Sequence, residues 1–152
     1  MSDSILDQIQ NDMTAAMKAR DADTLSTLRM LKSSLMEAKT KKPKDALLGR
    51  DEEIEVLQRY AKKRRETIEE VRKVGRQDLV TREEQEIAIT ARYLPAAIGE
   101  EELRAVIRDV VAQVGAAGPK DSGKVIGAVL AQVKGRADGS AVSKLVREIL
   151  TG

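Results

Sequence analysis

Glycines and basic residues gather near the end of the chain in a pattern that suits contact with a phosphate backbone. Gly127 precedes the run Lys134-Gly135-Arg136, and Lys120, Lys124 and Lys144 lie around them in the sequence. A glycine-bearing turn between two cations lets backbone amides and positive side chains approach one anionic strand together. An ordinary connection between two helices would also place glycines here, for the dihedral angles that glycine permits. Spacing alone leaves both interpretations open.

Three acidic clusters are the candidates for a metal site or for acid–base chemistry: residues 51–53, residues 83–86 and residues 100–102. Each lies in the first turns of an expected helix, where a carboxylate gains roughly 0.3–1 kcal/mol from the helix dipole. Consecutive carboxylates also point around a helix and not toward one point. We therefore expect these clusters to serve helix stability and solubility, and we predict no metal site.

The chain contains no histidine and no cysteine, which limits the catalysis it can perform. A serine nucleophile needs an activating base, and without histidine only a serine–lysine pair remains. Ser122-Gly123-Lys124 is too short a match for that chemistry, and it lacks the first glycine and the preceding strand of a phosphate loop. We predict no catalytic residues and no cofactor, and therefore a protein that is not an enzyme.

A basic run, Arg59, Lys62, Lys63, Arg64 and Arg65, lies within a long expected helix. Acidic residues at helical spacing would pair with several of these cations, as on any solvated helix. The alternative is a surface that docks a protein partner. Arg64 interrupts the apolar stripe of this helix, so we expect it to extend its charge to solvent, to pair with a carboxylate, or to mark where the helix leaves the core.

Composition excludes several other classes of protein. The 27 basic and 25 acidic residues give a net charge of +2, so a nucleic-acid-binding surface would have to be local. With only Tyr60 and Tyr93 as aromatic residues, stacking of bases is a poor interpretation. No apolar run is long enough to span a membrane, the first residues do not resemble a secretion signal, and there are no cysteines for disulfides. We expect a soluble cytoplasmic protein with an aliphatic core.

Apolar residues recur at steps of three and four throughout the chain, which predicts an all-α fold. We expect one helix from about residue 5, with Ile5, Ile9, Ala16 and Met17 inward, and a second that Asp23 or Thr24 caps. The further helices are expected at residues 51–74, 78–94, 100–114 and 122–133, and after the break at Asp138-Gly139. In the fourth helix, the inward residues are predicted to be Leu79, Ile87, Ala91 and Leu94.

The composition changes at residues 95–99, from a heavily charged segment to one rich in Val, Gly and Ala. We place a domain boundary there. Residues 1–95 would form a helical domain with a long third helix, and residues 96–152 a small domain of three helices.

Six short segments, distributed over essentially the whole chain, form a distinctive pattern. They are Leu28-Arg29-Met30-Leu31-Lys32, Arg82-Glu83-Glu84-Gln85-Glu86, Tyr93-Leu94-Pro95, Gly123-Lys124-Val125-Ile126-Gly127, Lys134-Gly135-Arg136-Ala137-Asp138-Gly139 and Leu145-Val146. Together they resemble the bacterial YqeY family. In its C-terminal half that family is similar to the tail of the B subunit of the aspartyl/glutamyl-tRNA amidotransferase, a helical module that contacts tRNA. The resemblance implies a three-helix, tail-like domain and makes tRNA a candidate ligand.

The chain departs from the amidotransferase tail at particular positions. Asp138-Gly139 stands where the tail tends to carry Asn-Pro, Ser143 where asparagine is usual, and Ala131 where lysine is common. The serine–lysine centre of the amidase subunit and the phosphorylating core of the B subunit have no counterpart here. These departures weaken a direct transfer of RNA contacts and leave the fold inference intact.

Three hypotheses about function follow. The leading one is a non-catalytic helical adaptor that binds tRNA or another RNA through the glycine-basic turn and its neighbouring lysines. The second is a protein-interaction module that docks a partner through the long third helix. The third is an accessory component of a glutamine-dependent amidotransferase, whose carbon–nitrogen ligase activity would come from family association alone.

Overall fold

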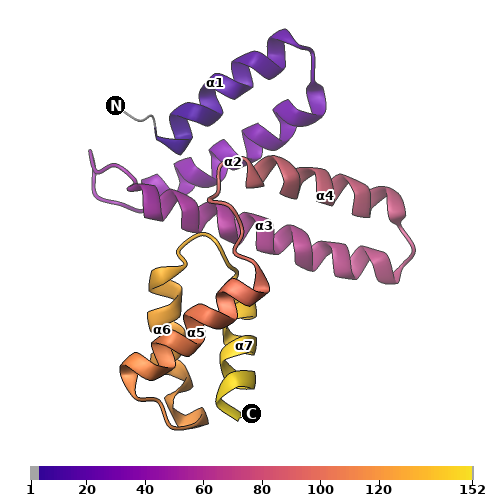
Figure 1. The fold of residues 1–152 in the computed structure, drawn as a ribbon. Helices are drawn as coiled ribbons and strands as arrows, with labels where there is room; N and C mark the ends of the chain where they lie inside the picture. Colours follow the sequence, from indigo (N-terminus) through magenta and orange to yellow (C-terminus); the bar gives the residue numbers. More distant parts are fainter. Residues whose placement is uncertain (1–3, 152) are drawn as a thin grey trace. The chain divides into compact units, whose positions relative to one another are not determined.

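The structure, a computed structural model, describes residues 4–151. Within this range the chain forms helices joined by turns and contains no strand, which confirms the predicted all-α class (Figure 1). The helices pack as two compact units that divide between Leu94 and Pro95. None of the helices in these residues is long and apolar enough to cross a membrane. Independent folding of the two predicted domains, residues 1–95 and 96–152, stays a prediction.

The N-terminal unit is built from α1 (Ile5–Lys18), α2 (Ala22–Thr40), α3 (Arg50–Lys73) and α4 (Gln77–Ala91). The long α3 was expected from the sequence, and α4 returns alongside it as a hairpin (Figure 1). Mostly aliphatic side chains from these helices meet in one core. Its buried members are Ile5, Ile9, Ala16, Leu28, Leu31, Leu35, Leu57, Tyr60, Ile89 and Tyr93.

The end of α1 and the start of α2 differ from expectation. Met17 is 54% exposed, because it lies about 80° around the helix from Ile9, whereas Ala16 is nearly in line with Ile9. Neither Asp23 nor Thr24 caps α2. The cap is Asp21, whose carboxylate accepts the Thr24 hydroxyl at 2.7 Å and the Thr24 amide at 3.2 Å, and these bonds lower the pKa of Asp21.

A backbone reversal explains this earlier start. Arg20, two residues after the end of α1, takes a left-handed φ of 55°, so the chain has already turned when it reaches Asp21. α2 therefore begins at Ala22, before either of the residues that we expected to cap it.

Glu53 is buried, with 2% of its surface exposed, although we expected its cluster to serve helix stability and solubility. Its carboxylate accepts the backbone amides of Ile5 at 3.2 Å and Leu6 at 2.9 Å, in the first turn of α1. Amides in a first helical turn have no partner within their own helix. Glu53 thus caps α1 from α3 and stabilises that helix, whereas the expected contribution to solubility was wrong for this buried residue.

Polar contacts join α3 to α4 where the apolar stripe of α3 is interrupted. The Arg64 guanidinium lies 4.9 Å from the centre of the Tyr60 ring, and its Nε lies 3.4 Å from Glu83 Oε2. The Tyr60 hydroxyl donates to Glu86 at 2.8 Å. Burial and then the charge of Glu86 raise the pKa of the Glu83 carboxyl. Of the three expectations for Arg64, pairing with a carboxylate is the one observed.

The buried face of α4 is not the predicted one. Leu79, Ile87 and Leu94 are half-buried and Ala91 is exposed, whereas the buried residues are Val80, Ile89, Thr90 and, beyond the helix, Tyr93. Glu86 lies three and four residues before Ile89 and Thr90, so turning its carboxylate toward Tyr60 turns those two residues inward as well. The helix also ends at Ala91, and the Tyr93 hydroxyl then donates to Asp12 of α1.

The C-terminal unit contains α5 (Glu100–Val114), the 3-10 turn η1 (Pro119–Asp121), α6 (Ser122–Gln132) and α7 (Gly139–Thr151). Gly115 ends α5 with a left-handed φ of 66°. We expected a break at Asp138-Gly139 before the last helix, but Gly139 is the first residue of α7. The core of this unit is wholly aliphatic. Its buried members are Leu103, Ile107, Val110, Val125, Val129, Val133, Val142, Leu145 and Val146.

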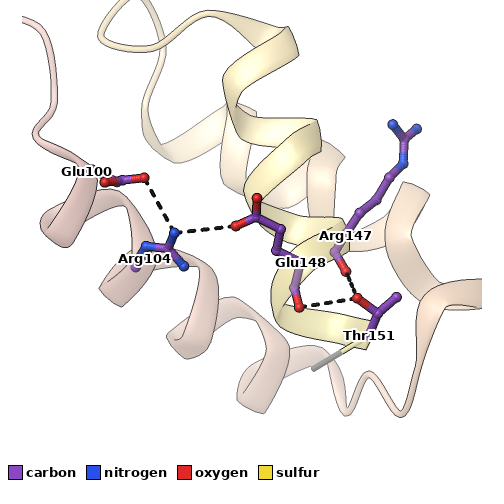
Figure 2. Close-up of polar contacts among 5 residues, drawn as sticks. All are labelled: Glu100, Arg104, Arg147, Glu148 and Thr151. Atoms are coloured by element: carbon purple, nitrogen blue, oxygen red, sulfur yellow. Dashed lines mark hydrogen bonds and ion pairs between the residues drawn. The ribbon is translucent and has the colours of Figure 1, made fainter.

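An arginine links α5 to α7 at the surface of this unit. Figure 2 shows Arg104 Nη2 between two carboxylates, 3.4 Å from Glu100 on its own helix and 3.3 Å from Glu148 on α7. Near the end of α7, the Thr151 hydroxyl donates to the carbonyl of Arg147 at 2.8 Å. Glu100 therefore lies in the first turn of α5 and also pairs within its own helix.

The cap that Glu53 provides leads to a prediction about stability. We expect Glu53→Ala to lower the free energy of unfolding by about 2–3 kcal/mol, because it leaves the amides of Ile5 and Leu6 buried without an acceptor. The control is Glu55→Ala, which removes a side chain that is 68% exposed and pairs with Arg59 at 3.4 Å. An exposed pair of this kind contributes at most about 0.5 kcal/mol. Chemical denaturation followed by circular dichroism compares the variants, and equal losses would contradict the capping role.

Candidate nucleic-acid interface

The glycine-basic turn that the sequence singled out follows the end of α6. Val133 is buried in the core of the C-terminal unit, and Gly135 takes a left-handed φ of 77° two residues later. A side chain at Gly135 would be strained in this conformation, so the glycine is required by the turn itself. The turn has a structural function whether or not it also contacts a ligand.

Arg136 is occupied by contacts within the C-terminal unit. Its Nε donates to the carbonyl of Ala96 at 3.1 Å, and its two terminal nitrogens lie 3.5 Å from the carboxylate of Glu102. Its own carbonyl accepts the amide of Ile98 at 2.8 Å. Arg136 therefore fixes the segment that enters α5, and its guanidinium is not presented freely to an anionic strand.

Three of the predicted site residues lie close together between η1 and the middle of α6. Lys120 is in η1, and Lys124 and Gly127 follow on the exposed side of α6. A Cβ atom placed on Gly123 or Gly127 would meet no other atom within 4 Å, so this side of the helix is open. Lys120 and Lys124 form no ion pair or side-chain hydrogen bond with residues 4–151. This end of α6 can accept a close approach by an extended anion.

The remaining predicted residues lie apart from these three. Lys134 is exposed just beyond the opposite end of α6, roughly 15 Å along the helix axis from Lys124 at 1.5 Å per residue. Lys144 is exposed on α7, next to the buried residue Leu145. The structure thus brings together Lys120, Lys124 and Gly127, and it places the glycine-basic turn at the other end of the same helix.

Sequence reasoning missed the partners that occupy Arg136. Glu102 lies 34 positions before Arg136, and the Ala96 carbonyl carries no side-chain signal at all. Periodicity finds the helices but cannot show which acidic residue meets which base between them. The residues that the structure describes contain no group of three or more acidic, histidine or cysteine side chains suited to a metal ion.

Comparison with known proteins identifies relatives along most of the chain. A family model described as Yqey-like protein matches residues 6–150. A Pyrenophora tritici-repentis protein named altered inheritance of mitochondria protein 41, mitochondrial, is 29% identical over 153 residues, which cover 96% of this chain and 81% of that protein. A Schizosaccharomyces pombe protein described as uncharacterized is 35% identical over 88 residues, which cover 57% of this chain and 69% of that protein. Since one relative is named mitochondrial, the cytoplasmic location expected for this chain stays a prediction.

The contacts of Arg136 predict a local loss of stability when the guanidinium is removed. We expect Arg136→Ala to accelerate amide hydrogen exchange in α5 about five-fold, equivalent to about 1 kcal/mol, because the Ala96 carbonyl and Glu102 lose their donor. In Arg136→Lys, exchange in α5 should be almost as fast as in Arg136→Ala, because an ammonium cannot reproduce the planar, forked contact of the guanidinium. Lys144→Ala, at an exposed position of the same unit, serves as the control and should leave exchange unchanged. Exchange read by NMR that is the same in all three variants would contradict a packing role for Arg136.

Proposed function

Because the chain belongs to the YqeY family, we propose that it is a non-catalytic helical adaptor that binds tRNA or another RNA through its C-terminal unit. The resemblance of this unit to the tail of the amidotransferase B subunit supports the choice of ligand. Any part in an amidotransferase would then be one of positioning, because the chain supplies no visible catalytic group. We propose the cytoplasm as its location, since a chain without cysteine needs no oxidising compartment.

The observation that carries this proposal is the open, basic beginning of α6. Lys120 and Lys124 have no partner among residues 4–151, so their charges are available to phosphates. Gly123 and Gly127 have no side chain to hold a backbone away, and a Cβ atom placed on either would meet no atom of another part of the chain within 4 Å. Cations beside a helix surface without side chains let a nucleic-acid strand lie close to the protein backbone.

The C-terminal unit contains no aromatic residue, which limits how it can contact RNA. Tyr60 and Tyr93 are the only aromatic residues in the sequence, and both precede Pro95. The C-terminal unit therefore cannot stack bases on aromatic rings, which is the common way of holding single-stranded nucleic acid. Binding must rely on charge and on the shape of the RNA backbone, so it should be tolerant of sequence and sensitive to salt.

Replacing the available lysines tests the proposal. We expect Lys120→Ala, Lys124→Ala and Lys144→Ala, combined in one variant, to weaken binding about equally for several tRNAs. The slope of log affinity against log salt should fall in magnitude by roughly 2–3 units, because each lost phosphate contact releases fewer counterions. Filter binding or fluorescence anisotropy over a salt series measures both effects.

Arg136 is left unchanged in this variant, so that a loss of binding is not confused with a loss of packing. The control combines Lys62→Ala and Lys63→Ala, which removes exposed cations from α3 in the N-terminal unit. This control should retain the affinity and salt slope of the wild type. Absence of salt-sensitive tRNA binding by the wild type at low ionic strength, or a greater loss in the control, would refute the proposal.

A further inference from the structure

A groove of about 800 Å³ lies between α2 and α3 in the N-terminal unit, and none of the predicted RNA-binding residues lines it. It extends from Met30 on α2 to Lys41, directly after that helix, and along α3 from Glu52 to Glu66. At 1.5 Å per residue these segments are roughly 15–20 Å long, which corresponds to about three turns of another helix. We call this feature the α2–α3 groove.

The apolar residues of the α2–α3 groove follow helical spacing on both sides. Met30 and Ala38 lie two turns apart on α2, and Val56 and Tyr60 lie one turn apart on α3. The Met30 side chain is 49% exposed, so its apolar surface is available within the groove. Grooves of this kind, with apolar residues at helical steps and an adaptable methionine, suit the apolar face of an amphipathic helix.

The charges around the α2–α3 groove are mixed, with an excess of positive charge. Six of the described residues that line it are basic and four are acidic. Lys42 pairs with Glu52 at 2.6 Å, and Arg59 pairs with Glu55 at 3.4 Å. These pairs neutralise one another, so the specificity of the groove depends on the charges that remain.

Three ammonium groups remain without a partner. Lys41, Lys62 and Lys63 line the α2–α3 groove and form no ion pair or side-chain hydrogen bond within residues 4–151. The carboxylates of Glu37 and Glu66 line it too and would repel the closely spaced phosphates of a nucleic acid. Individual acidic side chains on a helix could meet the lysines and avoid these two carboxylates. Apolar residues inside and unpaired lysines around them therefore favour an acidic peptide over RNA.

We propose that the α2–α3 groove binds an acidic amphipathic helix of a partner protein. The apolar face of that helix enters between α2 and α3, and its flanking carboxylates meet Lys41, Lys62 and Lys63. This interaction is independent of RNA binding, since it uses a different unit of the chain. The protein would then carry two binding surfaces, one for an anionic backbone and one for a protein helix.

Two synthetic peptides test the proposal with the full-length chain. Both carry the same leucine stripe at helical spacing; one has glutamate at the flanking positions and the other has lysine. We expect the glutamate peptide to bind at least ten-fold more tightly in fluorescence anisotropy. In NMR titrations it should shift the amide signals of residues 30–41 and 52–66. Equal affinities for the two peptides, or no binding of the glutamate peptide, would overturn the proposal.

Matched variants show whether the groove itself is responsible. Met30→Glu places a charge among the apolar residues and should lower the affinity for the glutamate peptide at least ten-fold. Met17→Glu is the control, because Met17 is 54% exposed on α1 and does not line the groove. Lys62→Glu with Lys63→Glu should reverse the preference between the two peptides. Unchanged binding by the Met30 variant would overturn the proposal.

RNA provides the last discriminating measurement. tRNA should leave the signals of residues 30–41 unchanged, and the variant lacking Lys120, Lys124 and Lys144 should bind the glutamate peptide as the wild type does. Shifts in the α2–α3 groove with tRNA but not with the peptide would assign it to nucleic acid and overturn the proposal. Failure of RNA binding with intact peptide binding would instead refute only the function proposed for the C-terminal unit.

Discussion

The arrangement of the N-terminal unit depends on one buried carboxylate. Glu53 on α3 accepts the first amides of α1, so the beginnings of two helices 48 residues apart must meet at one point. Removing a carboxylate from water is costly unless it is fully hydrogen-bonded, which makes this contact directional in a way that aliphatic packing is not. α1 then leads away from this point and α2 returns toward it, so that α2 lies beside α3 and the two helices flank the α2–α3 groove.

Elsewhere in the fold, a few directional polar contacts also fix the positions of segments that pack around aliphatic cores. Tyr60 donates to Glu86 and so joins α3 to α4, whereas Tyr93 donates to Asp12 and so joins the segment after α4 to α1. These bonds fix positions along the helices that aliphatic packing alone does not fix. Both hydroxyls are protonated donors at physiological pH, because the ordinary pKa of tyrosine is about 10, and burial raises the pKa of each further. In the C-terminal unit, which has no tyrosine, Arg136 supplies this kind of contact.

The candidate binding surfaces consist of cations that the fold does not use. Lys120 and Lys124 in one unit and Lys62 and Lys63 in the other have no partner within residues 4–151. Arg136 and Arg64 are in the same sequence neighbourhoods, yet both are paired with glutamates. A basic residue that serves packing is therefore a poor candidate for ligand contact, whatever its position in a motif.

Helix periodicity was sufficient to predict the class of the fold and most of the element bounds. The bounds of α5 agree with the sequence prediction, because acidic residues begin this helix and Gly115 ends it. Local signals could not predict contacts between helices. The burial of Glu53, the inward turn of Glu86 and the pairing of Arg136 each depend on a partner at least 26 positions away. The same holds for the candidate site. Residue types predicted its lysines, but they could not show which of these lysines remain unpaired.

Hydrogen–deuterium exchange of the full chain with and without tRNA tests most directly whether RNA binds the open side of α6. At low ionic strength, tRNA should slow exchange in residues 122–132 and leave α3 unchanged, and the protection should disappear as salt is raised. Protection that is confined to α3, or no protection anywhere at low salt, would contradict the assignment of RNA binding to the C-terminal unit.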